Sequence, residues 1–126
     1  MGQGCYMAVG YGWVDATSFV NRDKRGYATN KALSAIIEDG PNDGFRSAYE
    51  SEQSWLAVPL LDMSGTFDGG ADVSDNRTAF PLDDLEAQIE RLNPGGLERA
   101  RSLCAQVVAL CPNAPPPKLI LMLDYD

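Results

Sequence analysis

The chain of 126 residues carries ten basic and 18 acidic side chains, a formal net charge of −8, and no histidine. This balance argues against direct binding to nucleic acid, because the phosphate backbone repels a negative surface. Without histidine, Ser–His–Asp and Cys–His catalysis are excluded, and the commonest general base and metal ligand are missing. The length and the 44% hydrophobic content fit one globular domain spanning residues 1–126.

The beginning of the chain lacks the features of a targeting segment. No basic region precedes a long apolar run, as a secretory signal peptide requires. No segment approaches the roughly 20 apolar residues of a membrane span. We therefore expect a soluble, cytoplasmic protein with no membrane partner. The three cysteines fit a reducing compartment as buried apolar side chains, namely Cys5, Cys104 and Cys111.

The first predicted element is a strand near residues 4–14. Bulky side chains alternate along one face, whereas Gly10 and Gly12 lie on the other. Glycine inside a strand marks a bulge or the close approach of another backbone. We expect this face to provide packing space for a helix or a contact surface.

A turn and a short helix are expected next. Residues 21–26 form a polar turn whose basic side chains predict a solvated loop. Asn30 is a favourable N-cap for a helix near residues 30–39. One or two further helical turns are predicted within residues 45–52. The basic residues of the turn are Arg22, Lys24 and Arg25.

A second strand is expected near residues 54–63. Its apolar run is almost unbroken, so both faces should be covered, but Pro59 cannot donate to a ladder and indicates an edge or a bulge. The polar, glycine-containing residues 64–80 predict a long loop. Loops of this length commonly carry function, so this loop is the first candidate binding surface.

Two helices and a strand complete the prediction. Pro81 suits the first position of a helix near residues 81–92. Asn93 suits the N-cap of a helix near residues 94–111, with apolar side chains at three- and four-residue spacing. An apolar strand near residues 118–125 should be central in the sheet. The result is an α+β fold, a small mixed or antiparallel sheet packed against helices.

A mainly apolar core follows from these periodicities. It should form where the helical stripes meet the strands. The predicted core residues are Val9, Leu33, Ile36, Leu56, Val58, Leu85, Ile89, Leu103, Val107, Leu119, Leu121 and Leu123.

The acidic side chains gather along one part of the chain, around the long loop and the helix that follows. A surface of this sign speeds encounters with basic proteins and suppresses binding to nucleic acid. A face that only maintains solubility is the other interpretation of these charges. Phe67 and Phe80 are candidate apolar anchors. The predicted partner-binding residues are Phe67, Asp68, Asp72, Asp75, Phe80, Asp83, Asp84 and Glu86.

The leading hypothesis is a small non-enzymatic binding protein that inhibits or regulates a basic protein partner. The partner would be a nuclease or another nucleic-acid-handling protein, and the chain would act as a monomer or homodimer. Anti-CRISPR and other anti-defence proteins of phages and mobile elements are a functional class that acts in this way, although no motif ties the sequence to a family. No catalytic residue, metal site or cofactor is predicted.

Two other functions stay open. A small metal-dependent enzyme or metal-binding protein would use loop carboxylates, because carboxylate oxygens are preferred ligands of Mg²⁺ and Ca²⁺. A small-molecule sensor would use a pocket lined by aromatic side chains. The candidate metal ligands are Asp62, Asp68, Asp72 and Asp124, and the candidate pocket residues are Tyr6, Tyr11, Trp13 and Trp55.

Overall fold

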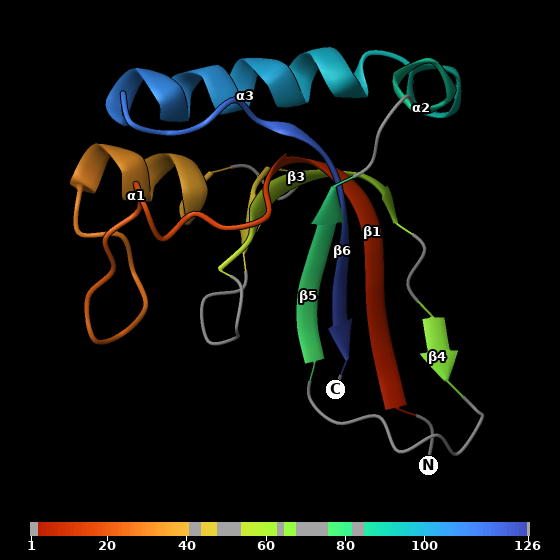
Figure 1. Cartoon of the computed structure of the whole chain (residues 1–126), viewed down its shortest axis with the longest axis horizontal. Helices are drawn as coiled ribbons and strands as arrows, with labels where there is room; N and C mark the ends of the chain where they lie inside the picture. The colour runs from red at the N-terminus through yellow and green to blue at the C-terminus, as the bar shows by residue number, and fades with distance from the viewer. Residues whose placement is uncertain are drawn as a thin grey trace.

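The computed structural model describes residues 3–40, 44–47, 54–62, 65–67, 76–81 and 85–125 (Figure 1). Within these ranges, three helices pack against an antiparallel sheet, which confirms the predicted α+β fold. The helices are α1 (Lys31–Ile37), α2 (Glu86–Leu92) and α3 (Gly96–Leu110). The strands are β1 (Gln3–Trp13), β2 (Arg46–Ser47), β3 (Leu56–Asp62), β4 (Gly65–Phe67), β5 (Asn76–Pro81) and β6 (Lys118–Tyr125).

Strand β1 organises the sheet. The strand order is β2-β3-β1-β6-β5, and β4 pairs with the beginning of β1. Strand β6 therefore has a partner on each side, as predicted for a central strand. Helix α3 crosses over β1 and β3, whereas β1, β5 and β6 extend away from the helices toward the end of the sheet where both chain termini lie (Figure 1).

The contact between β1 and β3 explains the glycines and the proline of these strands. Val9 lies opposite Leu61 and Gly10 opposite Pro59, so one residue of β3 is left over as a bulge. Pro59 stands beside this bulge and outside the short stretch of β3 that pairs with β2, which confirms the prediction. A Cβ on Gly12 would lie 2.1 Å from the carbonyl oxygen of Leu56, so the two backbones approach too closely for any side chain.

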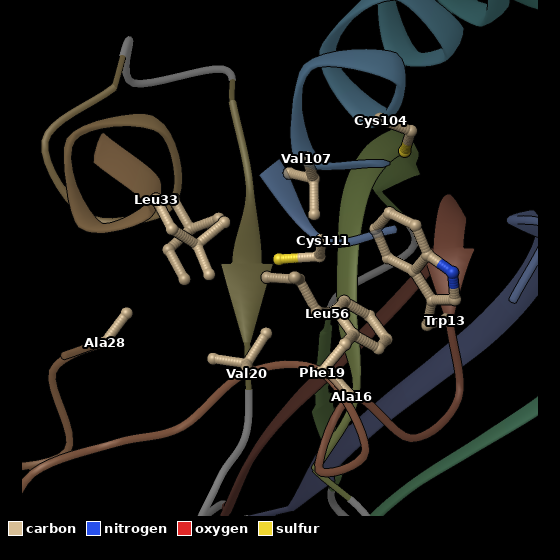
Figure 2. Packing of buried hydrophobic residues seen from close by; sticks show 11 residues of the cluster. Trp13, Ala16, Phe19, Val20, Ala28, Leu33, Leu56, Cys104, Val107 and Cys111 are labelled. Carbon is tan, nitrogen blue, oxygen red and sulfur yellow. The ribbon is translucent and has the colours of Figure 1, made fainter. Parts of the chain in front are cut away.

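Buried side chains lie on both faces of the sheet. On the helix side, Trp13 of β1 and Leu56 of β3 meet Leu33 of α1 and Val107 of α3 (Figure 2). A second cluster on the opposite face contains Ala8, Trp55, Ala57, Ile120 and Met122.

The core prediction is confirmed in part. Buried members are Val9, Leu33, Leu56, Val58, Ile89, Val107 and Leu119, whereas Ile36, Leu85, Leu103, Leu121 and Leu123 are only half-buried. The prediction omitted Ile120 and Met122, which are fully buried, because it placed only alternate residues of this strand in the core.

The predicted long loop at residues 64–80 is wrong in part, because it contains β4 and β5. These strands were not predicted because the segment is polar and contains several glycines. They are held in the sheet by backbone hydrogen bonds to β1 and β6. Pro81 ends β5 opposite Ile120 instead of beginning a helix. A proline is tolerated there because β5 is the last strand in the sheet order and its end needs no further donor.

Asn93 closes one helix and does not cap the next. Its N–H donates to the carbonyl oxygen of Ile89, and its side-chain amide donates to that of Leu60 across 2.9 Å. Helix α3 begins at Gly96 after Gly95, whose positive φ of 79° makes the turn between the helices. By contrast, Asn30 caps α1 as predicted, accepting from the N–H groups of Ala32 and Leu33.

The further helical turn predicted within residues 45–52 is also wrong where it can be compared. Arg46 and Ser47 form β2 and pair with Ala57 and Leu56 of β3. Residues 48–52 lie outside the described residues.

Candidate functional site

Three of the predicted partner-binding residues lie in described elements. Phe67 ends β4 opposite Gln3, Phe80 lies in β5 opposite Leu121, and Glu86 begins α2. The others fall outside the described residues, namely Asp68, Asp72, Asp75, Asp83 and Asp84.

Two acidic segments, residues 68–75 and 82–84, are separated in the chain by β5. Phe67 and Asn76, which precede and follow residues 68–75, pair with Gln3 and Tyr125 at the end of the sheet remote from the helices. Pro81, which precedes residues 82–84, lies at the other end of β5, about 17 Å away at roughly 3.3 Å per residue. The acidic segments are therefore attached to two separate places in the fold.

Glu86 joins the two C-terminal helices. Its carboxylate lies 2.9 Å from the guanidinium of Arg101 in α3, which in turn lies 5.7 Å from the ring centroid of Tyr11. A hydrogen bond with Tyr11 and the pairing with Glu86 raise the pKa of Arg101 above its ordinary value. The charge of Glu86 is thus compensated locally, although its side chain is 60% exposed.

The charges of the chain are divided unevenly. The described ranges hold all ten basic residues and nine of the 18 acidic ones. The other nine acidic residues fall in segments 41–43, 48–53, 68–75 and 82–84 and at position 126. Five of these nine acidic residues fall within residues 68–84, namely Asp68, Asp72, Asp75, Asp83 and Asp84.

The aromatic side chains proposed for a sensor pocket do not share one pocket in the described structure. Trp13 lies on the helix side, where its indole N–H donates to the carbonyl oxygen of Pro115 across 2.6 Å. Trp55 belongs to the cluster on the opposite face, and its buried indole N–H has no hydrogen-bond partner among the described residues. Tyr11 contacts Arg101, and the side chain of Tyr6 lies outside the described part of the chain.

Two of the three cysteines are buried apolar residues, as predicted. Cys104 is fully buried and its sulfur lies 3.5 Å from the carbonyl oxygen of Tyr11. Burial raises the pKa of the Cys104 thiol to about 12 and also raises the pKa of Cys111. Because the thiolate is the reactive form, neither thiol is an activated nucleophile at neutral pH.

The described ranges contain neither a metal-ligand cluster nor a membrane-spanning helix. They hold no group of three or more Cys, Asp or Glu side chains placed to bind a metal ion. None of the helices in these ranges is long and apolar enough to cross a membrane.

A groove of about 620 Å³ lies between the loop that precedes α1 and α1 itself. Its walls carry exposed cations, Arg25 and Lys31, and the half-exposed ring of Tyr27. The sequence showed the basic residues but predicted only a solvated loop. The remaining lining residues are Asp23, Ala28, Thr29, Ser34, Glu38 and Asp39.

Glu38 fixes the wall of this groove. Its carboxylate accepts hydrogen bonds from the guanidinium of Arg22, the N–H of Ala28 and the hydroxyl of Ser34. The pair is only slightly exposed, 13% for the Arg22 side chain and 16% for Glu38. One carboxylate therefore links the loop to the last turn of α1.

Asp23 fixes the tip of the loop. Its carboxylate accepts from the N–H groups of Arg25 and Tyr27, and Gly26 closes the turn with a positive φ of 88°. The guanidinium of Arg25 lies 5.3 Å from the ring centroid of Tyr27 and 3.3 Å from Asp23. An aspartate followed three residues later by a glycine is typical of a turn, so Asp23 and Gly26 are the sequence signal for this arrangement.

Comparisons with protein-family models, with curated proteins and with solved structures find no match for this chain. The charges and geometry of the chain are therefore the basis on which a function can be assigned.

Proposed function

We propose that this chain is a small acidic, non-enzymatic binding protein that inhibits or regulates a basic protein partner. The partner is a nuclease or another nucleic-acid-handling protein of the cytoplasm, and the chain is an accessory protein of a phage or mobile element, anti-CRISPR or anti-defence-like in its mode of action. The observation that carries this proposal is the concentration of six acidic residues within residues 68–86, a stretch that contains one basic residue, Arg77.

Electrostatics connects this charge distribution to a basic partner. A local negative field attracts a positive surface over about one Debye length, roughly 8 Å at physiological salt. Such attraction mainly accelerates association, whereas apolar contacts mainly slow dissociation. Phe67 and Phe80 are the proposed apolar contacts, and they lie in β4 and β5 beside the acidic segments.

The positions of the acidic residues in the chain suggest that two groups of them contribute separately to partner binding. Asp68, Asp72 and Asp75 follow β4, whereas Asp83 and Asp84 follow β5 and precede Glu86. The two groups of carboxylates can therefore be neutralised independently, without changing a described hydrogen bond.

The test begins with capture of a partner from the native host, followed by binding kinetics with the purified partner. We expect the association rate to fall about tenfold when the salt concentration rises from about 0.05 M to 0.3 M. We also expect Asp83→Asn with Asp84→Asn, or Asp68→Asn with Asp72→Asn, to slow association. Phe67→Ala or Phe80→Ala should mainly accelerate dissociation.

A matched control is Asp39→Asn with Glu98→Gln, which removes two charges from exposed positions in α3 and after α1. This variant should bind almost as well as the unchanged protein. An association rate that changes neither with the salt concentration nor in the two double variants of the acidic residues would contradict the proposal. A saturable rise in Tm with Mg²⁺, Mn²⁺ or Ca²⁺ that is lost in Asp68→Ala would support a metal-dependent function instead.

A further inference from the structure

We propose that the groove between residues 23–31 and α1 binds a small organic anion with a phosphate or carboxylate group. The residues that line this groove are different from the proposed partner-binding residues. Its volume of about 620 Å³ lies within the range of small-molecule sites, roughly 300–1,000 Å³.

The acidic side chains of the groove are largely engaged by the protein itself. Glu38 is occupied by Arg22, Ala28 and Ser34, and Asp23 by the backbone of the loop tip and by Arg25. These bonds compensate both carboxylates. They also hold the walls in place, so that the site needs little rearrangement before a ligand binds.

Both cations of the groove are exposed, although Arg25 also compensates the charge of Asp23. The side chain of Arg25 is 77% exposed even though it contacts Asp23 and Tyr27. Lys31, the first residue of α1, is exposed and has no side-chain partner among the described residues. A guanidinium and an ammonium on the walls of one groove can bind the same anionic group through charge-assisted hydrogen bonds.

The other lining groups suit the rest of such a ligand. The ring of Tyr27 is 50% exposed. The hydroxyls of Thr29 and Ser34 already donate to Asn21 and Glu38, so they can only accept a hydrogen bond from a donor group of the ligand. Asp39 is the one lining carboxylate that no described side chain engages. Its charge opposes anion binding, so its removal should strengthen binding while removal of Lys31 should weaken it.

The experiment is an NMR titration of the whole chain at constant ionic strength, with inorganic phosphate and citrate as separate probes. We expect saturable shifts of the amides of Tyr27, Ala28, Thr29 and Lys31 with at least one probe. Lys31→Gln and Arg25→Gln should each weaken binding about tenfold, as loss of a charged hydrogen bond implies. Asp39→Asn should strengthen binding severalfold.

Lys118→Gln is the matched control, because it removes an exposed lysine of β6 that does not line the groove. Its titration should match that of the unchanged protein. A response to phosphate alone or to citrate alone would support the site and identify the preferred group. No saturable shift with either probe up to about 20 mM, well above a dissociation constant of about 1 mM, would overturn the proposal. Equal weakening by Lys118→Gln would also overturn it.

Discussion

The carboxylates of this chain differ in how strongly they are bound within the fold, as Glu38 and Glu98 show. Glu38 accepts three hydrogen bonds and neutralises a mostly buried guanidinium, whereas Glu98 is exposed in the first turn of α3. A buried charge that loses its partner is costly because it has left water without compensation. Glu38 should therefore contribute far more to stability than an exposed acidic residue.

Replacement of Glu38 tests this role. Glu38→Ala should lower the free energy of unfolding by about 2–4 kcal/mol, because the ion pair with Arg22 and the hydrogen bond from the N–H of Ala28 are lost, although Arg22 still donates to the carbonyl oxygen of Gly26. Glu38→Gln should lower the free energy of unfolding by less, since its amide oxygen still accepts hydrogen bonds. Urea denaturation measures both values. The control Glu98→Ala should change stability by no more than about 0.5 kcal/mol, and an equal loss in both alanine variants would show that Glu38 does not link the loop to α1.

At the scale of elements, the pairing of β1 with β3 depends on the absence of a side chain. A Cβ on Gly12 would meet the backbone of Leu56 and Ala57 at 2.1 Å and 2.6 Å. Backbone atoms of a paired strand cannot rotate away as the end of a flexible side chain can. At Gly10 one of the close atoms is the terminal methyl of Met122, which has more freedom to move.

Gly12→Ala should consequently lower the free energy of unfolding by about 3 kcal/mol or more, at the upper end of overpacking effects. Gly95→Ala provides a control of a different kind. No atom lies within 4 Å of the added Cβ there, and only the positive φ opposes the change, at a cost of about 1 kcal/mol. Chemical denaturation of both variants compares them, and a smaller loss for Gly12→Ala would contradict the close backbone approach.

At the scale of the whole molecule, the sheet carries buried side chains on both faces. The helices cover one face, and the cluster around Ile120 and Met122 lies on the other. Strand β6 contributes to both, which explains why its sequence is almost uniformly apolar and why alternation could not assign its faces.

Truncation of Met122 measures the contribution of the second face. Met122→Ala should lower the free energy of unfolding by about 2–5 kcal/mol, because the side chain is fully buried. Leu92→Ala is the matched control, since this leucine is 62% exposed and its loss should cost no more than about 0.5 kcal/mol. Thermal and urea unfolding report the difference. Similar stability of the two variants would show that the face opposite the helices adds little to the core.

The sequence alone determined the elements whose signals lie within a few neighbouring residues. Apolar side chains at helical spacing predicted a helix near residues 94–111 with Val107 in the core, and Asn30 predicted the start of α1. Helical spacing and N-capping depend on residues three or four positions apart, so both can be recognised from the sequence alone.

Tertiary structure alone decided features that join distant residues. The side chain of Asn93 donates to the carbonyl oxygen of Leu60, 33 positions away, and makes no capping bond to α3. Strand β5 exists because β6 supplies its backbone partners some 40 positions later in the chain. The acidic residues of the candidate binding surface were evident in the sequence, but their attachment at the two ends of β5 was not. The groove beside α1 also could not be predicted from the sequence. Hydrogen bonds from Arg22 and Ala28 to Glu38 hold the loop beside α1, and Arg25 and Lys31 line the groove between them.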